Sequence, residues 1–192
     1  MKKLLGILVL GLLLITPSQA DDIRDFEIEG MSIGDSALDF FSEEEIKNNS
    51  EYWWPDKTYT QVPFSGLEFL KTYDDLDFSY KTDDKKYKIY SITGIIWFDN
   101  INDCHKKQKE IDQEFSEIYK NTKKKYTTYT YDKERFGNST SKQILYNFKS
   151  KDGIVLECKD WENKFQTEGW RDNLSISLDT KEFQAWLRKV SN

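Results

Sequence analysis

KKYKIYSITGIIWF, at residues 85–98, is the stretch that decides the fold. Its apolar side chains fall on both faces of an extended chain: Tyr87, Ile89, Ile95 and Trp97 on one, and Tyr90, Ile92, Ile96 and Phe98 on the other. A strand with two apolar faces needs cover on both sides. The stretch therefore predicts a central strand, covered by a helix on one side and by aromatic side chains on the other.

Other strand-like stretches flank this central one. Strands are predicted before it at about residues 58–73 and 77–81, with a turn at Asp83-Asp84, and after it at about residues 126–131, 142–149, 153–162 and 172–178. The connections between most of these stretches are short, which favours antiparallel pairing.

Helical patterns occur in three places. Residues 30–49 fit two short pieces, because Ser32-x-x-Asp35 and Ser42-x-x-Glu45 both have the spacing of a capping box. Residues 101–120 carry an apolar stripe with helical period, and Asp179-x-x-Glu182 predicts a capping box before a closing helix. The closing helix has an apolar stripe of Phe183, Trp186, Leu187 and Val190.

The resulting order is helix, three strands, helix, four strands, helix. It predicts the α+β class, with an antiparallel sheet of about six or seven strands and helices packed mainly on one face. A helix followed by a meander occurs twice in this order, which suggests a structural pseudo-repeat.

The first twenty residues have the pattern of an export signal. Lys2 and Lys3 precede an apolar run that ends at Ile15, and the small residues Ser18 and Ala20 predict cleavage after Ala20. The run is too short to span a bilayer. We therefore expect residues 21–192 to form a single domain, periplasmic or secreted, without a membrane span.

Export changes the interpretation of the two cysteines, because an oxidising compartment favours disulfides. Cys104 lies near the start of a predicted helix and Cys158 on the inward face of a predicted strand, so we expect them to pair. Two unpaired buried thiols are the alternative. His105 is the only histidine, so a zinc site lacks ligands, and we expect neither a metal nor a cofactor.

The charge is unevenly distributed. Residues 21–60 contain 12 acidic and 3 basic side chains, whereas residues 61–192 contain 22 and 23. An acidic chain disfavours nucleic acid and anionic lipid as partners, because phosphate binding needs clustered Lys and Arg. Lys123-Lys124-Lys125 is the only tight basic run, and we expect it to complement the C-terminus of the preceding helix.

The N-terminal segment carries a resemblance to known proteins. Gly30-Met31-Ser32-Ile33-Gly34-Asp35-Ser36, followed by Phe40-Phe41-Ser42-Glu43-Glu44-Glu45-Ile46, resembles the start of small exported proteins from AT-rich bacterial genomes. A Gly-Met-Ser turn before a short helix is also similar to small outer-membrane assembly lipoprotein-type domains. The chain lacks the lipidated cysteine of that class, so anchoring and assembly partners are not carried over.

No catalytic motif stands out. Asp74-Asp75-x-Asp77 and Asp83-Asp84 lack the spacing and the glycine of a calcium loop, and turn or strand-flanking roles account for them. His105 lies beside a cysteine that we expect to be oxidised, which disfavours the usual hydrolase triads.

The best binding candidate is Tyr52-Trp53-Trp54-Pro55, between the N-terminal helices and the first strand. Adjacent Trp rings in a loop can stack on a sugar ring or an apolar peptide. The alternative is that one or both rings plug the end of the core. We expect Trp54, next to Pro55, to be the more buried and Trp53 to face solvent. Tyr126, Tyr129 and Tyr131 form a second aromatic row, which cross-strand packing explains without a ligand.

These observations predict a non-enzymatic binding or interaction domain whose partner is an envelope protein or a small apolar or carbohydrate ligand. The alternative is a carboxylate-dependent hydrolase of the cell envelope, which needs two acidic side chains in one cleft with separated pKa values. Convergent buried carboxylates would favour the hydrolase, and an exposed aromatic patch would favour the binding domain.

Overall fold

The computed structural model describes residues 22–191, so the predicted export signal lies outside the described residues. Within them, seven strands form one sheet: β1 (Tyr59–Ser65), β2 (Asp75–Lys81), β3 (Ser91–Phe98), β4 (Lys123–Thr130), β5 (Thr140–Asn147), β6 (Gly153–Asp160) and β7 (Asp172–Asp179). Their spatial order is β1-β2-β3-β7-β6-β5-β4, and every neighbouring pair is antiparallel. The predicted α+β class and the antiparallel sheet are confirmed.

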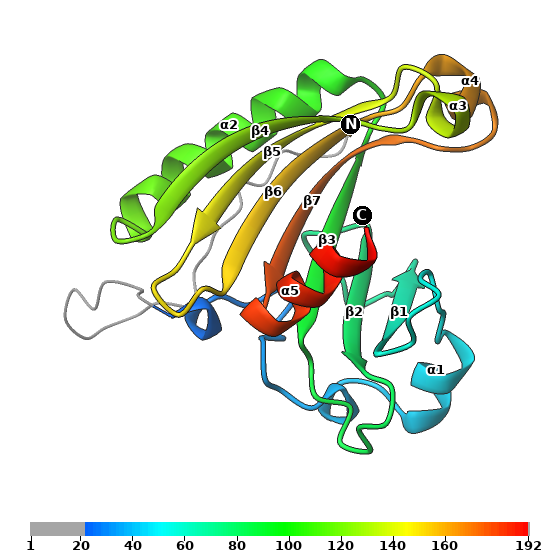
Figure 1. The fold of residues 1–192 in the computed structure, drawn as a ribbon, viewed down its shortest axis with the longest axis vertical. Helices are drawn as coiled ribbons and strands as arrows, with labels where there is room; N and C mark the ends of the chain where they lie inside the picture. Colours follow the sequence, from blue (N-terminus) through cyan, green and yellow to red (C-terminus); the bar gives the residue numbers. More distant parts are fainter. Residues whose placement is uncertain (1–21, 192) are drawn as a thin grey trace.

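Two meanders build this sheet, and the β3–β7 pair joins them (Figure 1). The first meander is β1 to β3, and the second is β4 to β7. The register of the joining pair sets Gly94 opposite Ile176 and Ile95 opposite Ser175. The stretch that contains β3 is therefore inside the sheet, as its two apolar faces predicted.

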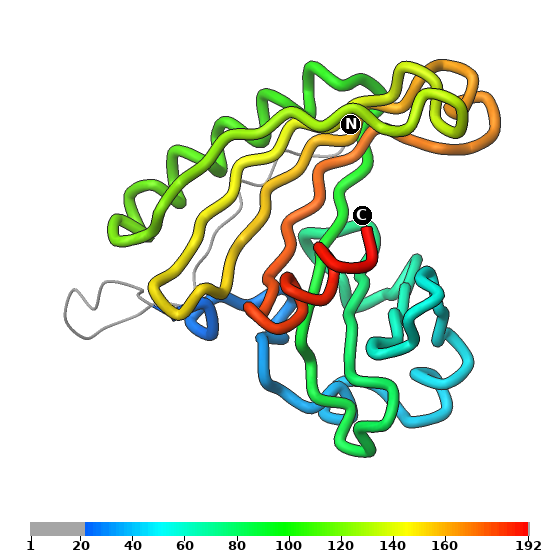
Figure 2. Tube along the Cα trace, viewed as in Figure 1, coloured from blue at the N-terminus to red at the C-terminus, as the bar shows by residue number. Residues whose placement is uncertain are grey.

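One face of the sheet is apolar and almost completely covered. Helix α2 (Ile101–Ile118) lies across it and contacts β3, β6 and β7. The N-terminal segment adds further cover with the 3-10 turns η1 (Ile23–Asp25) and η2 (Ala37–Asp39) and helix α1 (Glu43–Asn48). Figure 2 shows this segment, in blue and cyan, running along one end of the sheet toward β1. We call this side the apolar face.

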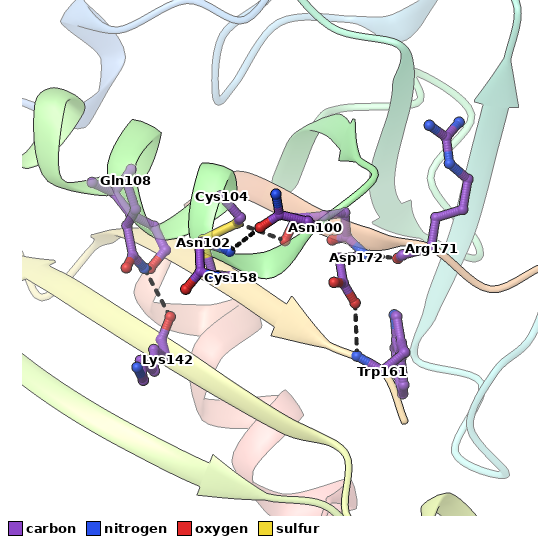
Figure 3. The surroundings of a disulfide bond; sticks show 11 residues. Asn100, Asn102, Cys104, Gln108, Lys142, Cys158, Trp161, Arg171 and Asp172 are labelled. Atoms are coloured by element: carbon purple, nitrogen blue, oxygen red, sulfur yellow. Dashed lines mark hydrogen bonds between the residues drawn. A yellow bond between two sulfur atoms is a disulfide. The ribbon is translucent and has the colours of Figure 1, made fainter. Parts of the chain in front are cut away.

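A disulfide between Cys104 and Cys158 joins α2 to β6, as the sequence predicted (Figure 3). The two Cα atoms are 6.0 Å apart. One turn further along α2, the Gln108 amide donates hydrogen bonds to the backbone carbonyls of Lys142 (2.8 Å) and Leu156 (2.9 Å). The helix is thus fixed to the sheet by a covalent bond and by a satisfied buried amide.

The opposite face carries many polar side chains, and we call it the polar face. Helix α5 (Lys181–Val190) packs against part of it, where Phe183 and Trp186 contact Tyr59 of β1. The predicted apolar stripe of this helix is confirmed. None of the helices within residues 22–191 is long and apolar enough to cross a membrane.

Two strands are shorter than the sequence predicted. The first ends at Ser65 because the chain turns at Gly66, whose φ is +66°. The central strand begins only at Ser91, because residues 87–89 hydrogen-bond to residues 34–37 of the N-terminal segment instead of to the sheet. Tyr87 has a φ of +49° at this point.

Three predicted details of helix ends are wrong, and one is confirmed. Ser42 and Glu45 form the predicted capping box of α1. Asp35 accepts a hydrogen bond from the Ser32 backbone (2.8 Å), but no helix follows directly. Thr180, rather than Asp179, is the N-cap of α5. Lys123-Lys124-Lys125 opens β4 instead of following a helix terminus.

Candidate binding site on the polar face

Residues 51–58 form the Trp53 loop, which is fixed at both ends. Glu51 and Gln61 exchange two backbone hydrogen bonds of 2.7 and 3.1 Å at the outer edge of β1. Asp56 accepts hydrogen bonds from Thr58 and from the Trp186 indole (3.1 Å). These contacts, with Thr58 first, lower the pKa of Asp56 to about 2. A loop fixed in this way loses little further freedom when it binds a ligand.

Trp54 points inward from this loop. It is partly buried and packs against the cluster of Tyr59, Phe183 and Trp186 beneath α5. The prediction that Trp54 is the more buried of the two adjacent indoles is confirmed. Its ring attaches the loop to the folded domain.

Trp53 and Tyr52 point outward, with 55 % and 49 % of their surfaces exposed. The Trp53 indole N–H donates a hydrogen bond to Glu51 Oε2 (2.5 Å). The Lys57 ammonium lies 4.9 Å from the centroid of the Tyr52 ring. Both rings are therefore held by polar contacts of their own loop, while apolar area stays open to solvent. Such rings suit stacking on a ligand.

Next to β1, which follows this loop, the polar face is formed by β2, β3 and β7. Asp77 lies opposite Thr93, and Thr93 lies opposite Ser177. The hydroxyl groups of Thr93 and Ser177 bond each other (2.9 Å). In the neighbouring row, the Ser91 hydroxyl donates to Asp179 Oδ1 (2.6 Å). The hydroxyl groups of Thr93, Ser177 and Ser91 thus have partners within this face.

Asp77 differs from these neighbours. Its carboxyl makes no hydrogen bond and no ion pair with any of the residues that the structure describes. Part of the side chain remains accessible, yet protein atoms surround the carboxyl group, and this burial raises the pKa of Asp77 to about 7. The positive charge of Lys159 lowers the pKa, whereas Glu51 and Asp179 raise it further.

Gln61, which is only 3 % exposed, is one of four residues that carry a buried polar side-chain atom without a partner among the described residues; the others are Tyr59, Ser141 and Asn173. Gln61 Oε1 accepts a hydrogen bond from the Trp53 backbone N–H (3.4 Å), but its Nε2 has no partner among the described residues. The register sets Gln61 opposite Ser79, two residues along β2 from Asp77. An unused donor and an unused acceptor are therefore diagonal neighbours on one face.

Asp179 is the other carboxyl group of this face with a raised pKa. Burial raises its pKa to about 6, and the Ser91 hydrogen bond partly offsets this effect. The register places Asp179 two strands and two residues away from Asp77. In an uncurved sheet, that offset corresponds to about 12 Å between Cα atoms. The two carboxyl groups thus share a face but have different immediate partners.

The remaining aspartates singled out from the sequence have structural roles. Asp74 and Asp75 accept hydrogen bonds from the backbone N–H and the indole N–H of Trp97, both 2.9 Å long. Asp84 accepts from the backbone of Lys86 (2.9 Å). Turn and strand-flanking roles are confirmed for these residues, and Asp77 is the exception.

His105 lies in the first turns of α2, beside the disulfide. Burial lowers its pKa, and Lys142 adds to this effect. Within residues 22–191, no group of three or more His, Cys, Asp and Glu side chains is arranged to hold a metal ion.

The predicted row of three tyrosines is wrong, because its members point to different sides of β4. Tyr126 faces α2, where its hydroxyl donates to Asp112 (3.2 Å). Tyr129 and Tyr131 lie on the opposite side and form an edge-to-face pair with ring centroids 5.2 Å apart. Side chains alternate between the two faces along a strand, so Tyr126 and Tyr129, which are three residues apart, point to opposite sides.

Two short helices, α3 (Lys133–Phe136) and α4 (Asn163–Thr167), were not predicted, and they carry a second aromatic cluster at the far end of the sheet (Figure 1). Its rings contact one another: Tyr131, Phe136, Trp161, Phe165 and Trp170. Trp170 is 41 % exposed, whereas Phe165 is buried. Most of this aromatic area packs within the cluster, unlike that of Trp53.

A groove of about 460 Å³ lies between α2 and the edge strand β4. Among its lining residues, the Tyr126 hydroxyl donates to Asp112 (3.2 Å) and the Gln108 amide donates to two backbone carbonyls. Lys124 forms an ion pair with Asp112 (2.6 Å) and donates a hydrogen bond to Ser116 (2.8 Å). None of the residues that line this groove carries a buried polar atom without a partner among the described residues, whereas Gln61 does.

No protein family, curated protein or solved structure matches the chain.

Proposed function

We propose that the protein is an exported binding domain and that the Trp53 loop is its recognition surface. The observation that carries this proposal is the opposite placement of two adjacent indoles. Trp54 anchors the loop in an aromatic cluster, and Trp53 presents its ring to solvent. Tyr52 and Trp53 thus place two adjacent exposed rings on an anchored loop, and loops held by a rigid scaffold commonly carry binding residues.

The disulfide supports the exported part of the proposal. Cys104 and Cys158 are bonded, and structural disulfides persist mainly in oxidising compartments. Fractionation of the full chain in a bacterial host tests this part. We expect a periplasmic or secreted product that begins at Asp21 and is about 2 Da lighter than its reduced form. A cytoplasmic product with two alkylatable thiols would contradict it.

Envelope extracts test the recognition surface. The purified protein is immobilised and its captured material compared with that of Trp53→Ala and Trp170→Ala, both of which remove an exposed indole. We expect Trp53→Ala to lose most of the captured material and Trp170→Ala to keep it. Equal capture by the wild type and Trp53→Ala would contradict the proposal.

Asp77 is the one observation that favours the second candidate, a carboxylate-dependent hydrolase of the cell envelope. Its pKa of about 7 suits proton transfer near neutral pH. The mechanism also needs a second carboxyl group nearby, but Asp179 accepts a hydrogen bond from Ser91 and lies two strands away. Binding is therefore the better-supported function. Turnover of a bound glycan or peptide that Asp77→Asn abolishes would reverse this order.

A further inference from the structure

We infer that the ligand of the Trp53 loop is a carbohydrate, with one sugar ring stacked on Trp53 and a sugar hydroxyl group bound between Asp77 and Gln61. This inference rests on the proposed function, because it names the ligand class of the same surface. It stands on three groups that the fold leaves unused in one corner of the polar face: an open ring, a donor and an acceptor.

The donor and the acceptor require a ligand group that can serve both. Gln61 Nε2 is a buried donor without an acceptor, and the Asp77 carboxyl is an acceptor without a donor. They are diagonal neighbours across the β1–β2 pair. A hydroxyl group donates one hydrogen bond and accepts others, so a single sugar hydroxyl can bond both. Buried polar groups are normally satisfied, and the ligand would complete them.

The Trp53 ring belongs to the same corner. The Gln61 side chain reaches the Trp53 backbone N–H (3.4 Å), so the amide links the polar face to the loop. Glu51 bonds the Trp53 indole and is also one of the charges that act on Asp77. A sugar presents an apolar C–H face to a ring and hydroxyl groups at its edge, which matches this arrangement.

Other ligand classes fit less well. An ammonium or guanidinium group would pair with Asp77 but would bring no acceptor to Gln61 Nε2. An anionic ligand would meet the charges of Glu51 and Asp77. An apolar peptide side chain would cover Trp53 and leave both polar groups buried and unpaired, which opposes binding.

Calorimetric titration at about pH 7.5 tests the inference with the mature, disulfide-bonded protein. The probes are hexamers of β-1,4-glucose, α-1,4-glucose, β-1,4-xylose and β-1,4-N-acetylglucosamine, with hexalysine as the cationic probe. We expect at least one hexasaccharide to bind. Trp53→Ala and Asp77→Asn should each weaken that binding by about tenfold or more, as expected for the loss of a stacked ring or of a hydrogen bond to a charged group.

Asp75→Asn is the matched control. It makes the same change on the same strand and face, but the Asp75 carboxyl is occupied by the Trp97 indole. We expect unchanged affinity for the hexasaccharide. Binding of no hexasaccharide at about 1 mM, equal losses in Asp75→Asn and Asp77→Asn, or Asp77-dependent binding of hexalysine alone would each overturn the inference.

The outcomes separate this inference from the proposed function. If Trp53→Ala captures the same envelope material as the wild type, the recognition surface itself is wrong. If Trp53→Ala loses captured material but no hexasaccharide binds, the surface stands and only the ligand class fails. Thermal unfolding of each variant, compared with the wild type, distinguishes a loss of binding from a loss of folding.

Discussion

The two faces of the sheet use the same strands for different purposes. On the apolar face, Gln108 is buried and its amide donates to two backbone carbonyls. On the polar face, Gln61 is equally buried, but its amide donates to nothing among the described residues. Both residues are glutamines in regular secondary structure, Gln61 in β1 and Gln108 in α2, so the difference lies in their surroundings.

This difference separates the face that contributes most to stability from the face on which we propose binding. Polar groups that hold a fold together are satisfied by the fold, because an unpaired buried donor costs about 1–3 kcal/mol. Unsatisfied groups beside an exposed ring carry that cost in the free protein, and a ligand can remove it. Because successive side chains of a strand point to opposite faces, neighbouring residues of one strand belong to the apolar face and to the polar face in turn.

The largest expected effect comes from the apolar face. Leu156 is fully buried beneath α2, whereas Val155 is partly exposed on the polar face. We expect Leu156→Ala to lower the free energy of unfolding by about 3–4 kcal/mol and Val155→Ala by about 1 kcal/mol or less. Urea unfolding followed by fluorescence measures both. Similar losses would show that the faces do not differ in stability.

The disulfide gives the next effect and belongs to the same face. Its two cysteines are 54 residues apart, so the bond restricts a large loop in the unfolded chain. We expect the Cys104→Ser/Cys158→Ser variant to lose about 2–4 kcal/mol of stability. Calorimetry of the oxidised wild type against this variant measures the loss. Affinity for the ligand of the Trp53 loop should stay unchanged, because the bond lies under the other face.

Much of the apolar face could be predicted from the sequence. The double apolar pattern of residues 85–98 identified the interior strand, and the inward alternation of Cys158 indicated the disulfide. Both predictions rest on the alternation of side chains along a single strand, which is visible in the sequence. Pro55 likewise marked a loop in which Trp54 packs inward and Trp53 faces solvent.

The polar corner could not be predicted, because it depends on which residues the register brings together. Asp77 reads as one more aspartate in an acidic run, and only its position opposite Thr93 and near Gln61 separates it from Asp75. The two short helices were missed for a related reason. Four or five residues show no period, and ring contacts with Trp161 and Trp170 hold them in place.

Asp77 gives a smaller effect of opposite sign. Its pKa rises from 3.8 to about 7 on folding, so the folded protein holds a proton that the unfolded chain has released. Stability from this group is present below about pH 4 and is lost as the pH rises through about 7. We expect Asp77→Asn to be more stable than the wild type at about pH 7.5, by about 1–2 kcal/mol after solvent screening.

Thermal unfolding of Asp77→Asn across this pH range measures the effect. The gain should shrink as the pH falls and approach zero at about pH 3 and below, where Asp77 is protonated in both the folded and the unfolded protein. Asp179 has a pKa raised to about 6 and adds a background of the same sign to both proteins. A constant difference at every pH would show that the Asp77 carboxyl is not desolvated.

The smallest expected effect on stability is that of Trp53→Ala, and it separates the two indoles most sharply. Trp53 exposes more than half of its surface, and its indole bonds only Glu51 of the same loop. Its removal should change the free energy of unfolding by less than about 0.5 kcal/mol. Trp54→Ala removes a ring from the cluster with Tyr59 and Trp186, so it should cost about 2 kcal/mol. Urea unfolding of both variants gives the comparison. A large loss in Trp53→Ala would make that ring part of the fold, and its exposure would then no longer point to a ligand.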